Sequence, residues 1–227
     1  MRYSDRAESF NYEKGANRTN LGDLVNVDPY LSKHSDLVAL MVLEHQTMVH
    51  NRITSANYYG RIYETQVDTA AKLRAQPKKG RDGKLQVKID PLARPRLDQA
   101  VRRLVDSLLM VRAEGLTQPI SGTSNFAKEF AGKTLPSKLL DSKGRSLREL
   151  DLKSRLFRYP CSYLIYSEAF DALPKRVRLL VYQELWQVLT GTEEGFRNRH
   201  LSEEDRKAVI EILRVTKPEL AKAWARQ

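Results

Sequence analysis

The chain has 227 residues, of which 41% are hydrophobic and 30% charged, so its composition is that of a globular protein with enough apolar material for a core. Its one cysteine, Cys161, excludes an internal disulfide, a CxxC redox pair, a cysteine-based zinc site and a CxxCH haem attachment. The net charge is +11, the longest apolar run (37–43) is far shorter than the roughly 20 residues of a membrane span, and the first residues lack the apolar stretch of a signal peptide.

Residues 1–30 are polar and rich in turn formers, which predicts an extended lead-in to a single helical domain over 31–227. A long helix is expected over about 35–76, because this stretch lacks proline, contains one glycine, Gly60, and begins at a capping residue, Ser35. Its first two turns, 37–43, are apolar on every side. We therefore expect this end of the helix to be covered all round, at the centre of a bundle.

A basic linker is predicted at about 77–94, where prolines and glycines interrupt a run of positive charge. Residues 72–103 hold eleven Lys and Arg against three Asp, and they supply most of the net charge. Such a segment is either a solvated loop, with 77–88 as the preferred trypsin site, or a basic patch that docks an acidic protein or nucleic acid. The patch residues are Lys78, Lys79, Arg81, Lys84, Lys88, Arg94, Arg96, Arg102 and Arg103.

The rest of the chain predicts further helices. The apolar spacing and the end signals favour helices at 95–113, 124–131, 161–173, 174–189, 202–215 and, beginning near Pro218, at the C-terminus. The segment 147–157 is ambiguous between helix and extended chain. The fold class expected is therefore all-α, an irregular helical bundle around one long helix.

His45 is the main candidate for binding chemistry, because it lies within the apolar stripe of the long helix. It is either a core histidine hydrogen-bonded to a neighbour or a ligand to haem iron or another metal. His50 is five residues further on, about 500° around the helix, so it points to a different surface. His34 shares the His45 face about 16 Å away along the axis. One ion therefore cannot readily take any two of these side chains, and they are candidates for separate contacts.

Two further residues carry weaker signals. His200 lies in a polar stretch and is expected to be a solvated loop residue, and Cys161 is expected to be a small buried side chain. An enzyme that uses Cys161 or His45 remains the least favoured alternative. No histidine lies within 35 residues of Cys161, the acidic residues form no pair at general acid–base spacing, and the glycines form no phosphate loop.

Three strings resemble the C-terminal part of a family of large, uncharacterised bacterial proteins found mostly in planctomycetes and acidobacteria. They are 30–46 (YLSKHSDLVALMVLEHQ), 154–167 (SRLFRYPCSYLIYS), and 201–218, which begins LSEED and ends TKP. The resemblance covers nearly all of the chain from about Phe10. Longer members of the family look exported and are often described as cytochrome c-like, with haem-attachment sequences upstream.

The resemblance implies a non-catalytic helical module of an exported, periplasmic cytochrome c-like redox protein that contributes to haem or metal binding or to electron transfer. Its partner would be the upstream cytochrome-like region or another redox protein, and haem is the cofactor it suggests. Under this hypothesis His45, His50 and His34 are the candidate cofactor contacts. This chain departs from the longer members because it lacks both CxxCH and an export signal, and a cytoplasmic location stays open.

Overall fold

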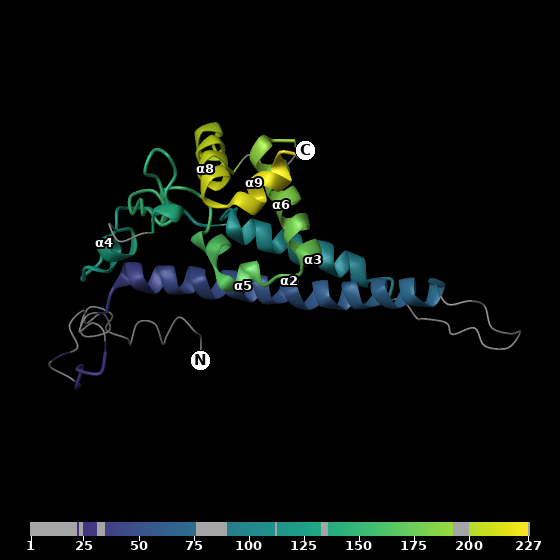
Figure 1. Cartoon of the computed structure of the whole chain (residues 1–227). Coiled ribbons are helices and arrows are strands. Elements are labelled where there is room, and N and C mark those ends of the chain that lie inside the picture. Colours follow the sequence, from purple (N-terminus) through teal and green to yellow (C-terminus); the bar gives the residue numbers. More distant parts are fainter. Residues whose placement is uncertain are drawn as a thin grey trace, which may run out of the picture.

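The protein is all-α in the computed structural model, as the sequence predicts (Figure 1). The structure describes residues 22, 25–30, 35–75, 90–111, 113–132, 136–192 and 200–226. The helices are α2 (Leu37–Ala75), α3 (Ala93–Leu108), α4 (Phe126–Phe130), α5 (Glu168–Asp171), α6 (Lys175–Thr190), α8 (Glu203–Thr216) and α9 (Pro218–Trp224), with the 3-10 turns η1 (Ser137–Leu139) and η2 (Tyr163–Tyr166). The described residues form no strand, only one isolated bridge between Leu150 and Phe157, in the segment that the sequence left ambiguous.

The long helix α2 begins at Leu37, and its cap is Asp36, one residue after the predicted cap Ser35. The Asp36 carboxylate accepts hydrogen bonds from the Ala39 N–H at 3.0 Å and from the Ser124 N–H at 2.9 Å and hydroxyl at 2.6 Å. These bonds lower the pKa of Asp36 despite its burial. One carboxylate thereby caps the helix and ties it to the segment that precedes α4.

Gly60 lies where α2 packs closely against α6. A Cβ atom placed there would lie 2.3 Å from the Cγ2 atom of Val177 in α6. The helix continues through this glycine to Ala75. The glycine therefore allows the helices to pack closely.

Helix α3 ends five residues before its predicted end. The Val111 N–H donates to the Asp106 carbonyl at 2.9 Å and the Met110 N–H to the Ser107 carbonyl at 3.4 Å, which is the pattern of a Schellman motif. Met110 takes the left-handed conformation at φ 55° in the position that glycine usually occupies. The apolar stripe runs on through Val111, so the spacing alone gave too long a helix.

The segment 161–173 is two short helical turns and not the single helix predicted. Ser162 and Ser167 both have extended backbone angles, and each side chain accepts a hydrogen bond from a backbone N–H two or three residues further on. Serine at such positions competes with helical hydrogen bonding and restarts the helix. The predicted helix ends hold further along the chain, where Gly191 is the left-handed C-cap of α6 and Ser202 caps α8.

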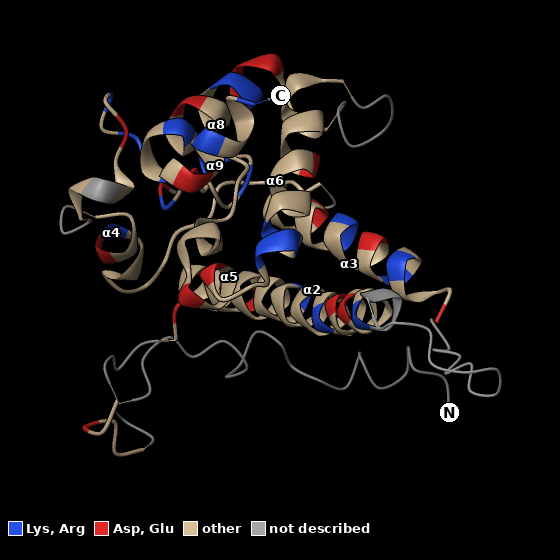
Figure 2. Cartoon of the chain, turned by 45° about the vertical axis from the view of Figure 1, so that its right-hand side comes forward, with Lys and Arg blue, Asp and Glu red and all other residues tan. Residues whose placement is uncertain are grey.

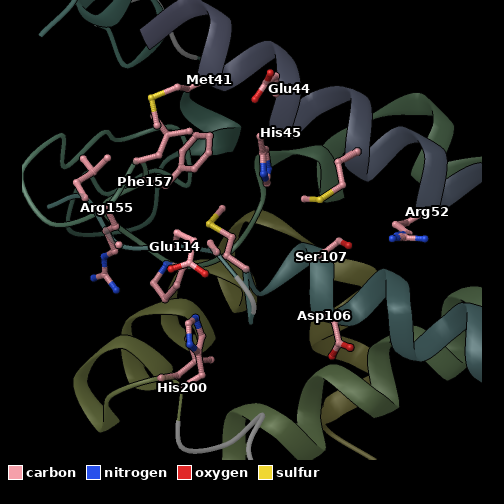
Figure 3. A pocket seen from close by; sticks show the side chains of 18 of the residues that line it. Met41, Glu44, His45, Arg52, Asp106, Ser107, Glu114, Arg155, Phe157 and His200 are labelled. Carbon is pink, nitrogen blue, oxygen red and sulfur yellow. The ribbon is translucent and has the colours of Figure 1, made fainter. Parts of the chain in front are cut away.

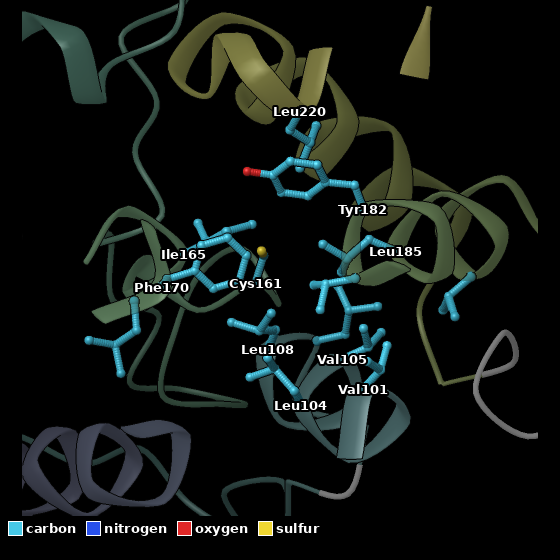
Figure 4. Close-up of a cluster of buried hydrophobic side chains, with 14 of the residues drawn as sticks. Val101, Leu104, Val105, Leu108, Cys161, Ile165, Phe170, Tyr182, Leu185 and Leu220 are labelled. Carbon is cyan, nitrogen blue, oxygen red and sulfur yellow. The ribbon is translucent and has the colours of Figure 1, made fainter. Parts of the chain in front are cut away.

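One main core joins the elements from α2 to the C-terminus. It includes Val49 and Ile53 of α2, the apolar stripe of α3, and residues of α6, α8 and α9 as far as Trp224. Trp224 fastens the C-terminal helix, because its indole N–H donates to the Tyr182 carbonyl at 2.8 Å. Figure 4 shows the Cys161 sulfur in this core, among Leu108, Ile165 and Tyr182.

The expectation that the first turns of α2 are covered on every side is wrong. Val38 and Val42 are buried, but Leu37, Leu40 and Leu43 are 49%, 53% and 56% exposed. The reason is that only one side of this end packs against described elements, namely α4 and η2. None of the described helices is both long and apolar enough to cross a bilayer.

Candidate functional site

A cavity of about 1230 Å³ lies between the first half of α2, the second half of α3 and three connecting segments. The helices contribute the lining residues Met41, Glu44, His45, Met48, Arg52, Gln99, Arg103, Asp106, Ser107 and Met110. The connecting segments contribute 113–116, 154–157, Pro160, His200 and Leu201. Figure 3 shows that the labelled side chains of α2 face those of α3 and of the connecting segments across this space. The volume is sufficient for an organic ligand or the edge of a partner molecule.

His45 is partly buried in the wall of this cavity, on the interior side of α2 as the sequence predicts. Its Nε2 atom lies 2.8 Å from the hydroxyl oxygen of Ser162, and its ring centroid is 4.9 Å from that of Phe157. Burial lowers the pKa of His45 to about 4, so the imidazole is neutral near pH 7.

The hydrogen bonds of Ser162 determine which ring nitrogen carries the proton. Ser162 is fully buried, and its oxygen already accepts the Leu164 N–H at 3.3 Å. Its own proton needs an acceptor, and His45 Nε2 is the one that the described residues supply. We therefore assign the hydroxyl as donor to Nε2, which leaves Nδ1–H as a hydrogen-bond donor.

This assignment does not fit His45 as an axial ligand to haem iron. A ligating nitrogen needs a free lone pair, and here Nε2 uses its lone pair for Ser162 while Nδ1 carries the proton. In this tautomer the neutral imidazole carries its one N–H on Nδ1. The structure supports a core histidine bonded to a serine, a partner that the sequence analysis did not identify.

All three internal methionines line the cavity, although the chain has four methionines in total, including Met1. Met41 and Met48 lie one turn to either side of His45 on α2, and Met110 lies two residues after the end of α3. A non-glycine residue in the left-handed conformation is strained by about 1 kcal/mol. At Met110 this strain places a thioether side chain in the cavity wall, where glycine would leave no contact. Flexible, polarisable methionines are typical of surfaces that adapt to a ligand.

The charged lining residues differ in how they are paired. Arg155 forms a two-pronged ion pair with Asp205, with both N–O distances 2.7 Å, so it is engaged within the protein. Arg52 and Arg103 have no carboxylate partner among the described residues. These two guanidinium groups are therefore available to a bound molecule.

The other candidate residues lie elsewhere. His34 is outside the described residues. His50 is partly exposed and does not line the cavity, in agreement with its predicted separation from His45. His200 is exposed, as expected of a loop residue, but it borders the same cavity as His45, which the sequence did not indicate. Cys161 is fully buried, and burial raises the pKa of its thiol to about 12, so it is not an activated nucleophile.

The predicted basic patch is only partly described. Lys78, Lys79, Arg81, Lys84 and Lys88 lie outside the described residues. Arg94 belongs to the first turn of α3 and not to the predicted linker, and Arg96 lies in this helix as predicted. They pair with Asp98 at 2.8 Å and with Asp90 at 2.9 Å. Arg102 lies 3.8 Å from Glu184. Figure 2 shows acidic as well as basic positions along the α3 ribbon, which weakens the case for a continuous basic surface on this helix.

The described residues contain no group of three or more His, Cys, Asp or Glu that could hold a metal ion. No protein-family model, no curated protein and no solved structure matches this chain. The case for a function therefore rests on the geometry of the cavity and on the resemblance of the three strings.

Proposed function

We propose that this chain is a non-catalytic helical module of a cytochrome c-like redox protein, and that its cavity is the surface on which the haem-bearing region or partner docks. The observation that supports this most directly is the convergence of the three strings that carry the resemblance. Met41 and His45 come from the first string, Phe157 and Pro160 from the second and Leu201 from the third, and all of them line the one cavity.

The lining supports docking and not ligation. Methionine, phenylalanine and proline side chains form an apolar wall that suits the edge of a flat, conjugated ring. His45 keeps its bond to Ser162 in this proposal and offers no lone pair to iron. An enzyme is less well supported, since Cys161 is buried and Ser162, although bonded to His45, is fully buried and outside the cavity lining.

A haem peptide tests the proposal, because its haem is covalently attached through CxxCH and exposes one edge. We expect the chain to bind it, as measured by calorimetry, with no change in the axial ligands reported by its absorption spectrum. Met48→Glu should weaken binding at least ten-fold, because Met48 lines the cavity and is 42% exposed, so the change leaves the core intact.

Leu40→Glu is the matched control. Leu40 lies on the same helix at 53% exposure and does not line this cavity, so this variant should bind as the wild type does. The docking proposal would be wrong if the Met48→Glu variant bound the haem peptide as tightly as the wild type, or if the wild type did not bind it at all.

A further inference from the structure

The cavity has two chemically different parts. The apolar residues Met41, Leu156, Phe157, Pro160 and Leu201 belong to the start of α2 and to the connecting segments. Arg52 lies further along α2, eleven residues after Met41, or about 16 Å along the axis. Figure 3 shows Arg52 and Phe157 on different sides of the space. A molecule that fills the cavity therefore meets an apolar wall and a cationic one.

We infer that the cavity binds a flat apolar molecule through its carboxylate groups, and that Arg52 and Arg103 are the residues that recognise them. This inference rests on the proposed function and adds the chemical class of the group that is bound. The two arginines come from different helices that pack side by side, and both line the same space. Guanidinium groups bind carboxylates with paired, charge-assisted hydrogen bonds, which gives direction as well as affinity.

Neighbouring polar groups complete the cationic part. Gln99 is one turn before Arg103 and Ser107 one turn after it on α3, and both line the cavity, so they can donate further hydrogen bonds to a carboxylate. His45 lines the wall between the two parts and is neutral near pH 7. Gln99 and Ser107 can both act as hydrogen-bond donors, and an ionised carboxylate can only accept hydrogen bonds.

The acidic lining residues form no ion pair with Arg52 or Arg103 among the described residues, although Asp106 lies one turn after Arg103 on α3. Glu44 precedes Arg52 by eight residues on α2, about 12 Å along the axis. Glu114 lies beside Arg155 and His200 in Figure 3, away from Arg52. Asp106 is nearer, but Figure 3 shows its carboxylate pointing away from Arg52, and it takes part in an interaction of its own.

The test compares protoporphyrin IX, a metal-free ring with two carboxylates, with its dimethyl ester, which has the same ring and no carboxylate. We expect the acid to bind wild-type protein at least ten-fold more tightly than the ester. The double variant Arg52→Gln/Arg103→Gln should lose ten-fold or more in affinity for the acid and bind the ester unchanged.

The control variant is Arg61→Gln/Arg96→Gln, which removes one exposed arginine from each of the same two helices outside the cavity. It should bind the acid like the wild type, so net charge alone does not explain a loss. Circular dichroism of both variants confirms that α2 and α3 are formed.

The outcomes separate the two proposals. If the acid and the ester bind equally and only Met48→Glu weakens them, the carboxylate inference is overturned and docking at the cavity stands. If the control and the cavity double variant lose affinity for the acid to the same extent, the attraction is general and the inference is again overturned. If neither porphyrin nor the haem peptide binds, both proposals fail.

Discussion

Burial of His45 makes the stability of the fold depend on pH. Its pKa is about 4 in the folded chain against an ordinary value of 6.5, so the unfolded state takes up a proton first as the pH falls. The free energy of unfolding should therefore decrease between about pH 6.5 and pH 4, by up to about 3 kcal/mol. Urea unfolding at pH 7 and pH 5 measures this loss.

Two variants assign this pH dependence to His45. His45→Gln keeps a hydrogen-bonding side chain next to Ser162 and should remove most of the change, whereas His50→Gln should retain it. The carboxylates with lowered pKa values, such as Asp36 and Asp141, lose their stabilisation mainly below about pH 4. The same slope in all three proteins would contradict the assignment.

Cys161 should be unreactive in the folded protein. Its side chain is fully buried among core residues, and the raised pKa of the thiol leaves almost no thiolate at neutral pH. We expect a thiol reagent such as DTNB to label it only at the rate of unfolding, and immediately in 6 M guanidinium. Fast labelling of the native chain would restore the alternative of a cysteine enzyme.

At the level of single residues, the sequence predicted the position of His45 on its helix but not the residue to which it is hydrogen-bonded. The helical period alone places His45 on the interior face, apart from His50. Its partner Ser162 is 117 residues away, so only the tertiary fold brings the two together. The tertiary fold likewise brings Arg52 and Arg103 to one cavity. The sequence analysis named only Arg103, as part of a basic patch and not as a cavity residue.

The end of α3 offers a test at the level of elements. Met110→Gly should relieve the left-handed strain and leave the free energy of unfolding unchanged or about 1 kcal/mol higher, despite the lost side-chain contacts. The same variant should bind the haem peptide more weakly, since a thioether leaves the cavity wall. Thermal unfolding and calorimetry on one sample check both; a clear loss of stability would show that packing of Met110 outweighs the strain.

The contact between α2 and α6 should not tolerate a methyl group. Gly60→Ala places Cβ against Val177, so we expect it to lower the free energy of unfolding by about 1–3 kcal/mol, even though alanine is the better helix former. Thr54→Ala, at an exposed position on the same helix, should have little effect in the same urea titration. A stabilised Gly60 variant would mean that α6 moves away without cost.

Helix boundaries were predictable where a local signal sets them. Ser202 caps α8 and Gly191 ends α6, and both residues are typical of those positions. The predicted helix ends were wrong at Met110, where a residue other than glycine takes the left-handed conformation that ends α3. They were also wrong at Ser162 and Ser167, where serine caps begin new helical turns. The spacing of apolar residues shows which face of a segment is buried. The same spacing can continue past the end of a helix, so it does not locate that end.

At the scale of the whole molecule, the sequence predicted the class of fold and one long helix, because periodicity and composition carry that information. The cavity was not predictable, since its wall joins segments near positions 45, 105, 115, 157 and 200. The exposed side of α2 at Leu37, Leu40 and Leu43 was also missed, because an all-apolar segment does not show which of its sides has a neighbour.

The main core extends from Val49 in α2 to Trp224 in α9, so the helices that contribute to it (α2, α3, α5, α6, α8 and α9) should unfold as one cooperative unit. Two probes report on different parts of it. Far-UV circular dichroism is weighted towards the 39 residues of α2, and tryptophan fluorescence reports on Trp186 and Trp224, whose ring centroids are 5.2 Å apart in α6 and α9. We expect the two urea transitions to share one midpoint.

Trp224→Phe makes this prediction more stringent, because it removes the indole bond to the Tyr182 carbonyl and leaves that buried carbonyl without this donor. If the core is one unit, this change at the C-terminal helix lowers the dichroism midpoint of the distant α2 together with that of the fluorescence of Trp186. Leu179→Ala, at a half-exposed position on α6, should leave both midpoints almost unchanged. A fluorescence transition that shifts while the dichroism transition stays in place would divide the molecule into two units, with α2 and α3 stable without the C-terminal helices.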